Sequence, residues 1–194
     1  MRWESLFADL EAQWAARESE DLDQQIAEAL ELERSRMLMA DRLRAAVGGD
    51  HPVRLRGGLG LQLRISEVGA DWLWGHVAGQ AVLVPLQALE SVGGLALRAA
   101  AEPSRTRQRL GITAPLRALA RDGQHVVVHG AQGPLGEGLL THVGRDHIDV
   151  RTGSPPEAGD GASGGEQAPG SGDRNPGAPT LTIPLNAVVM LRSR

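Results

Sequence analysis

One phrase occurs twice in this chain, and the repeat constrains the fold more than any other feature of the sequence. Residues 82–92 read VLVPLQALESV, and residues 181–191 read LTIPLNAVVML. In each copy an apolar run reaches a proline and is followed by a polar step and a second apolar run. A single pair of such phrases predicts two similar units of about 50 to 80 residues, rather than a solenoid of many short repeats.

Further matches place the same landmarks in the same order in both units. Residues 41–58 match residues 114–131 at a constant offset of 73, and residues 67–74 match residues 142–149. In each unit a short helical pattern precedes several segments in which apolar and polar residues alternate. Such alternation is typical of strands with one buried face. Each unit therefore reads as a short helix followed by five strands.

This plan predicts two small barrels. Five short, bent strands close best into a barrel, because closure leaves few free strand edges. We therefore expect a mainly β protein with α, in which a long N-terminal helix precedes two tandem five-stranded small β-barrels, each with a short leading helix. The predicted parts are an acidic amphipathic helix (1–40), a first barrel with its helix (41–94), an Arg-rich connector (95–113) and a second barrel with its helix (114–194). The Gly- and Pro-rich segment 153–179 reads as a disordered insertion in the second barrel.

The plan is similar to two known classes of small barrel. Helix, five strands, a glycine-bent second strand and an Asp-containing turn (Asp71, Asp146) make residues 41–94 and 114–192 resemble the Sm-like fold. The Val/Ile-Pro-Leu ending of each unit is similar to that of SH3-like barrels in translation factors. The Sm-like resemblance implies an RNA-binding or RNP-associated role.

The residues limit the Sm-like resemblance, and the chain as a whole shows a further resemblance. No Asn follows the Asp of either turn, and no Arg-Gly pair occurs between the fourth and fifth strands, so the resemblance does not extend to the RNA pocket of the Sm-like family. From MRWESLFADL onward, the whole chain also resembles a family of uncharacterised proteins from high-GC (actinobacterial-type) bacteria.

The composition excludes several kinds of chemistry. The chain has no Cys, and its twenty cationic side chains are all Arg. Thiolate catalysis, thiolate zinc sites, disulfides and Schiff-base lysines are therefore excluded. No pair of residues has a spacing that suggests catalytic geometry. We expect a protein that is not an enzyme, with no catalytic residues and no cofactor.

Histidines and tryptophans offer two further candidate sites. His125 and His129 lie on one face of a predicted strand and could join His142 or His147 at a metal. Ordinary strand positions are the favoured interpretation, so no metal site is predicted. Trp72 and Trp74 alternate along a strand and would form either a base-stacking platform or a packing surface for the N-terminal helix. Packing is the favoured interpretation of these two residues.

The Arg-rich connector and the helix after it are the candidate nucleic-acid surface. Guanidinium groups suit phosphate, and only Glu102 and Asp122 oppose them locally. The alternatives are a solvated helical face or a docking site for the acidic N-terminal helix. The candidate nucleic-acid-binding residues are Arg98, Arg105, Arg107, Arg109, Arg117 and Arg121.

The N-terminal helix is the candidate protein-binding element. Residues 1–40 carry ten acidic residues and four Arg, a net charge of −6. Apolar residues recur at helical spacing along it. The candidate partner-binding residues are Trp3, Leu6, Phe7, Leu10 and Trp14, and a second stripe follows at Leu22, Ile26 and Leu30.

These features predict a binding protein. No apolar run approaches the roughly 20 residues that span a bilayer, and the acidic N-terminal segment is unlike a secretory signal. We therefore expect a cytoplasmic protein without membrane association. Its predicted function is that of a non-enzymatic module that binds RNA or associates with an RNP, or alternatively of a protein-interaction adaptor that uses the N-terminal helix. Two similar units in one chain are also compatible with oligomerisation.

Overall fold

The computed structural model describes residues 2–102, 104, 106–153 and 179–193. The chain divides into two compact units, Met1–Met39 and Ala40–Arg194. Most of the segment predicted to be a disordered insertion, 153–179, lies outside the described residues, as does Arg105. Among the described residues, no helix combines the length and the apolar character that crossing a membrane requires.

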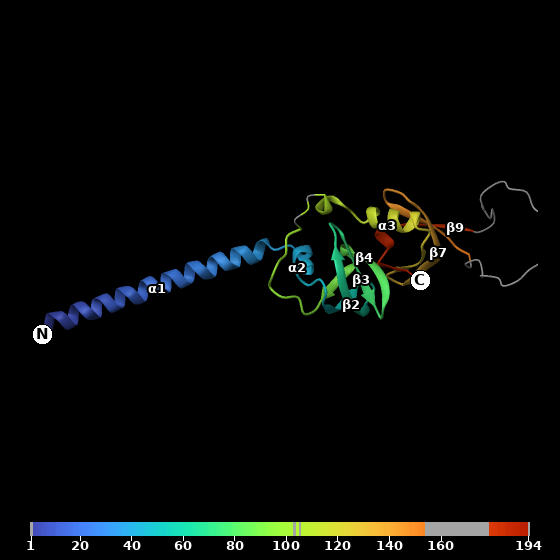
Figure 1. Cartoon of the computed structure of the whole chain (residues 1–194). Coiled ribbons are helices and arrows are strands. Elements are labelled where there is room, and N and C mark those ends of the chain that lie inside the picture. The colour runs from blue at the N-terminus through green and yellow to red at the C-terminus, as the bar shows by residue number, and fades with distance from the viewer. Residues whose placement is uncertain (1, 103, 105, 154–178, 194) are drawn as a thin grey trace, which may run out of the picture. The chain divides into compact units, whose positions relative to one another are not determined.

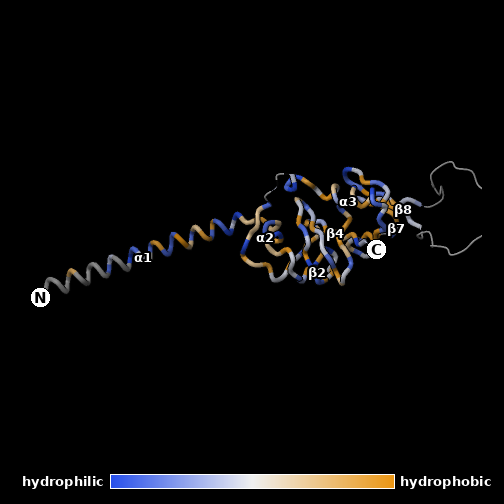
Figure 2. The backbone as a smooth tube through the Cα atoms, viewed as in Figure 1, coloured by the Kyte–Doolittle hydropathy of each residue, from blue (hydrophilic) through white to orange (hydrophobic). Residues whose placement is uncertain are grey.

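The N-terminal unit is formed by one helix, α1 (Arg2–Arg36), of 35 residues. At a rise of about 1.5 Å per residue, the helix is about 52 Å long. Figure 2 shows hydrophobic positions recurring between hydrophilic ones along its described part. Arg34 and Arg36 lie in the last turn, where positive charge complements the helix dipole.

The second unit consists of two halves with the same order of elements (Figure 1). The first half contains α2 (Met39–Ala45), β1 (Asp50–Leu55), β2 (Leu59–Val68), β3 (Trp72–Val77), β4 (Gln80–Pro85), the 3-10 helix η1 (Leu86–Ala88) and β5 (Leu89–Val92). The second half contains α3 (Thr113–Arg121), β6 (His125–Gly130), β7 (Gly133–Val143), β8 (His147–Arg151), β9 (Thr180–Pro184), η3 (Leu185–Ala187) and β10 (Met190–Ser193). Between them lies the connector, which includes η2 (Arg107–Arg109).

The prediction of two separate small barrels is wrong. The ten strands form one antiparallel sheet in the order β5-β1-β2-β3-β4-β10-β6-β7-β8-β9, and this sheet is not closed. Strand β4 pairs with β10, with Leu83 opposite Leu191 and Val82 opposite Arg192. The prediction assumed that each unit protects its strand edges by closing on itself. Instead, the fourth strand of the first half is protected by the last strand of the second half.

The sequence repeat corresponds to a repeat of backbone hydrogen bonds. In the turn between β2 and β3, the N–H of Gly69 donates to the carbonyl of Trp72 at 2.8 Å. In the equivalent turn between β7 and β8, the N–H of Gly144 donates to the carbonyl of His147 at 2.9 Å. Both positions require glycine, because a Cβ atom would meet the Trp72 ring at 2.2 Å or the His147 ring at 2.4 Å. The two turns are therefore built in the same way.

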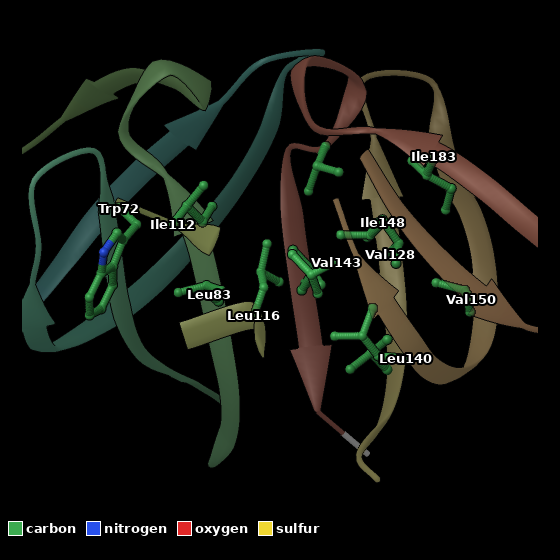
Figure 3. Close-up of a cluster of buried hydrophobic side chains, with 13 residues drawn as sticks. Trp72, Leu83, Ile112, Leu116, Val128, Leu140, Val143, Ile148, Val150 and Ile183 are labelled. Atoms are coloured by element: carbon green, nitrogen blue, oxygen red, sulfur yellow. The ribbon is translucent and has the colours of Figure 1, made fainter. Parts of the chain in front are cut away.

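Each half has its own hydrophobic core, but neither core is made by one half alone. The first core is built around residues such as Leu43, Leu63 and Val84, and it also includes Val189 and Met190 from the second half. The second core includes two residues of the first half, Trp72 and Leu83, beside Ile112, Leu116, Leu140 and Ile148 (Figure 3). The two halves of the second unit therefore complete one another.

Candidate functional site

The α1 apolar surface is the first candidate. It consists of five side chains that are each at least half exposed, namely Phe7, Trp14, Leu22, Ile26 and Leu30. The side chains of the other three predicted partner-binding residues, Trp3, Leu6 and Leu10, lie outside the described residues.

The α1 apolar surface turns around the helix. At 3.6 residues per turn, Trp14 lies about 20° around the axis from Phe7, whereas Ile26 lies about 100° away. A short straight partner helix cannot cover both ends of such a surface. A partner that covers all of it must either follow the turn or use two separate contacts.

The structure does not gather the predicted arginines into one cluster. Arg98 lies with Arg42 and His51 beside α2. Arg107 and Arg109 belong to η2, whereas the last two candidates belong to α3. The exposed candidates are Arg98, Arg107, Arg109, Arg117 and Arg121, and Arg105 lies outside the described residues.

A smaller arginine surface remains on α3 and η2. Arg117 and Arg121 are four residues apart and exposed, so they share the solvent face of α3, whose buried face carries Leu116. No ion pair joins these two arginines, or Arg107 and Arg109, to any residue that the structure describes. Their guanidinium groups are therefore available to an anionic ligand.

The tryptophans are packing residues, but the helix packed against them is α3, whereas the prediction named the N-terminal helix. Trp72 is 7% exposed, and its Nε1–H donates to the carbonyl of Leu110 at 2.9 Å. Trp74 is half-buried beside the same core. The backbone N–H of Ile112 donates to Oδ1 of Asp71 at 2.7 Å, so the start of α3 is held against β3. Both indole rings thus serve the attachment of α3 and the connector, and they do not form a stacking platform.

His125 and His129 do not contribute to a metal site with the other histidines. Both lie on β6 and are half-buried, and Nδ1 of His125 and Nε2 of His129 have no hydrogen-bond partner among the described residues. Burial and, secondarily, the nearby Arg192 lower the pKa of His129. Burial therefore favours the neutral form of this imidazole.

Three other side chains do meet. Ligand atoms of His142, His147 and Asp149 all lie within 4.8 Å of one another, and they form the only such metal-ligating group in the described part of the chain. The sequence interpretation considered both histidines but missed the carboxylate of Asp149. The sequence pattern could have indicated it, because His147 and Asp149 are two residues apart on one strand and must share a face.

The chain matches no protein-family model, no curated protein and no solved structure. Three surfaces of the molecule are the candidates for function: the α1 apolar surface, the arginines of α3 and η2, and the polar cluster of His142, His147 and Asp149 on β7 and β8.

Proposed function

We propose that this protein is a non-enzymatic adaptor that binds a partner protein through α1. The observation that carries the proposal is the α1 apolar surface, on which Phe7 is 60% and Trp14 71% exposed. Single exposed apolar residues are common in soluble proteins, but a series of large ones along one helix is typical of a surface that a partner covers. Burial of each would contribute about 1.5–3 kcal/mol, against the cost of association.

The charge of the helix defines the chemistry of the partner. Residues 1–40 carry a net charge of −6, so a second copy of α1 would place two strongly acidic helices side by side. A partner with an apolar groove and a basic rim would instead complement both the apolar residues and the carboxylates. The proposed complex is therefore a helix in a basic, apolar groove, and added salt weakens it.

Affinity capture with three forms of the full chain tests this proposal. The wild type is compared with the double variant Phe7→Ala/Trp14→Ala, because alanine removes the apolar contacts but favours the helix. The matched control is Leu59→Ala/Leu97→Ala, which removes two apolar residues of the second unit that are 41% and 63% exposed. A captured protein is then purified and its binding measured by calorimetry.

We expect the α1 double variant to lose at least tenfold in affinity, which corresponds to about 1.4 kcal/mol, while the control binds like the wild type. Equal binding by the wild type and the α1 variant would contradict the proposal. So would the failure of the wild type to capture any protein with a basic surface.

Binding of single-stranded RNA is a second candidate function. It is favoured by the four exposed arginines of η2 and α3, which have no ion-pair partner among the described residues. Fluorescence anisotropy at two salt concentrations would compare the wild type with Arg107→Ala/Arg109→Ala and Arg117→Ala/Arg121→Ala. We expect weaker binding and a flatter salt dependence for both variants, because each phosphate contact adds to the salt slope. Unchanged binding would remove this surface from consideration.

We further propose that the protein acts in the cytoplasm. The absence of Cys means that it gains nothing from an oxidising compartment. Fractionation of cells that express the tagged full chain, with a secreted and a cytoplasmic marker, tests the assignment. Recovery with the secreted marker would overturn it.

A further inference from the structure

The polar cluster on β7 and β8 is composed of His142, His147 and Asp149, and its position follows from strand geometry. His147 and Asp149 are two residues apart on β8, so both point to the same face. His142 lies opposite Asp149 in the register between β7 and β8. A bulge between Leu140 and His142 turns the His142 side chain to this face, although Leu140 points into the core.

Two neighbouring residues orient the polar cluster. Oδ1 of Asp146 accepts a hydrogen bond from Nδ1 of His147 at 2.8 Å. With Nδ1 occupied in this way, Nε2 of His147 is the nitrogen left for a ligand. The Thr182 hydroxyl donates to Oδ1 of Asp149 at 2.6 Å, which holds the carboxylate from the side of β9. Imidazole and carboxylate ligands of metals are commonly oriented by such second hydrogen bonds.

The first half of the sheet shows what these positions do when three of the four are apolar. In the register of the repeat, His142, His147, Asp149 and Thr182 occupy the places of Glu67, Trp72, Trp74 and Leu83. Those four residues of the first half line a small cavity beneath α3, together with Pro115, Ala118, Leu119 and Asp122.

The second half therefore has a different surface at the equivalent place. His142 is exposed, and both His147 and Asp149 are partly exposed. The three apolar residues that pack beneath α3 are replaced by an imidazole, a carboxylate and a hydroxyl, and a second imidazole takes the place of Glu67. Packing against a helix does not require this combination, because each of these groups would lose water on burial and would need a new polar partner. The polar cluster is instead accessible to a small ligand.

We propose that His142, His147 and Asp149 bind a divalent zinc ion. Two imidazole nitrogens and one carboxylate oxygen form a ligand set that zinc accepts, and the remaining coordination position is left to water. Imidazole ligands argue against Mg²⁺ and Ca²⁺, which prefer oxygen ligands only. The absence of Cys means that no thiolate site elsewhere in the chain competes for the ion.

The distances allow this coordination with a small adjustment. Ligand atoms around one tetrahedral zinc ion lie about 3.3 Å apart when each bond is about 2.0–2.1 Å long. The three candidate ligand atoms already lie within 4.8 Å of one another. His142 is exposed and its ring centroid lies 6.2 Å from that of His147, so a rotation of this side chain would bring its nitrogen toward the other two ligand atoms. The ion would join β7 to β8 and, through Thr182, would reach the edge strand β9.

Isothermal titration of ZnCl₂ into the EDTA-treated and dialysed full chain tests the proposal. The variants are His142→Ala and Asp149→Asn, and the control is His76→Ala, which removes a strand histidine of the first half. Asp146→Asn tests the positioning role of the carboxylate that bonds His147. A second measurement records the melting temperature of each form with and without ZnCl₂, because binding to the folded state alone raises it. Circular dichroism confirms that each variant is folded.

We expect one zinc ion per chain with micromolar or tighter affinity in the wild type and in His76→Ala. His142→Ala and Asp149→Asn should weaken binding at least tenfold and lose the zinc-dependent rise in melting temperature. Asp146→Asn should weaken binding by about tenfold or more, as loss of an orienting partner does. The proposal is overturned if the wild type binds no zinc, or if folded His142→Ala binds it as tightly as the wild type.

Discussion

In the first half of the sheet, α3 packs on the face of β3 and β4 that points away from the first core, whereas the equivalent face of β8 and β9 carries polar residues open to solvent. The backbone registers of the two places are the same, including the bulge in β2 and in β7. Three side chains change from Trp72, Trp74 and Leu83 to His147, Asp149 and Thr182. The covered face thus carries apolar side chains at these three positions, and the open face carries polar ones.

The leading helices of the two halves differ in a related way. Arg44 of α2 donates to the carbonyl of Gly69 at 2.9 Å and forms an ion pair with Asp41. Arg117 occupies the same place in the repeat, but it is exposed and has no described ion-pair partner. In the first half, Arg44 thus stabilises the turn between β2 and β3. In the second half, the equivalent arginine remains free for a ligand.

Replacing Trp72 and its counterpart His147 gives the sharpest test of this difference. Trp72→Ala removes a buried ring from beneath α3, and we expect it to lower the free energy of unfolding by about 3–5 kcal/mol. His147→Ala in zinc-free protein should change it by less than about 1 kcal/mol, because that side chain is partly exposed. Urea denaturation of both variants measures the difference, and similar losses would show that the two faces are equivalent after all.

A substitution in the β4–β10 pairing, which joins the two halves, should have the next largest effect on the free energy of unfolding. Leu191 is 1% exposed and pairs with Leu83, so Leu191→Ala should lower the free energy of unfolding by about 2–5 kcal/mol. Leu181→Ala on the edge strand β9 is the matched control, because Leu181 is 37% exposed. Since each core contains residues of both halves, unfolding of the second unit should remain one cooperative transition. Two separate transitions in the wild type would contradict the shared sheet.

Substitutions of the aspartates in the two turns, Asp71 and Asp146, should differ by a smaller amount in their effect on the free energy of unfolding. Asp71→Ala removes the acceptor of the Ile112 N–H, and we expect a loss of about 1–2 kcal/mol in the free energy of unfolding. Asp146→Ala should change the free energy of unfolding by less than about 0.5 kcal/mol in zinc-free protein, because its carboxylate is exposed and its side-chain partner is the adjacent His147. An equal effect of both substitutions would mean that the connector is not held by Asp71.

The smallest expected effect is a pH dependence that arises from His129 on β6. Burial lowers its pKa in the folded state, so the unfolded chain binds a proton more readily. Stability should therefore fall as the pH drops below about 6.5, the ordinary histidine value, and continue to fall until the lowered pKa is passed. His129→Gln should reduce this slope in urea titrations between pH 7 and 5. A slope that persists in His129→Gln would assign it to another group.

The sequence was enough to predict the repeat and the positions of the strands, because both depend on local patterns. Val53 and Leu55 alternate with polar neighbours and are buried in β1. The pairing of β4 with β10 was not predictable in this way. It joins residues such as Leu83 and Leu191, more than a hundred positions apart, and many strands in the chain are equally apolar.

The polar cluster was half predictable for a similar reason. Alternation places His147 and Asp149 on one face of β8, and this much can be read from the sequence. Strict alternation from the buried Leu140 would place His142 in the core, and only the bulge turns it outward. A bulge depends on how two strands fit together, so no pattern within one strand reveals it.

The place of β10 has a consequence for the synthesis of the protein. β10 follows every other strand in the sequence, yet it lies between β4 and β6 in the sheet. At about 5–20 residues per second, a ribosome needs roughly 5 to 20 s to translate the stretch from β4 to β10. During this time β4 is paired with β3 on one side only, and the first core lacks Val189 and Met190. The ladder between β4 and β10 therefore forms only after β10 has been synthesised, and until then one edge of β4 is an unpaired strand edge of the kind that can pair with another chain.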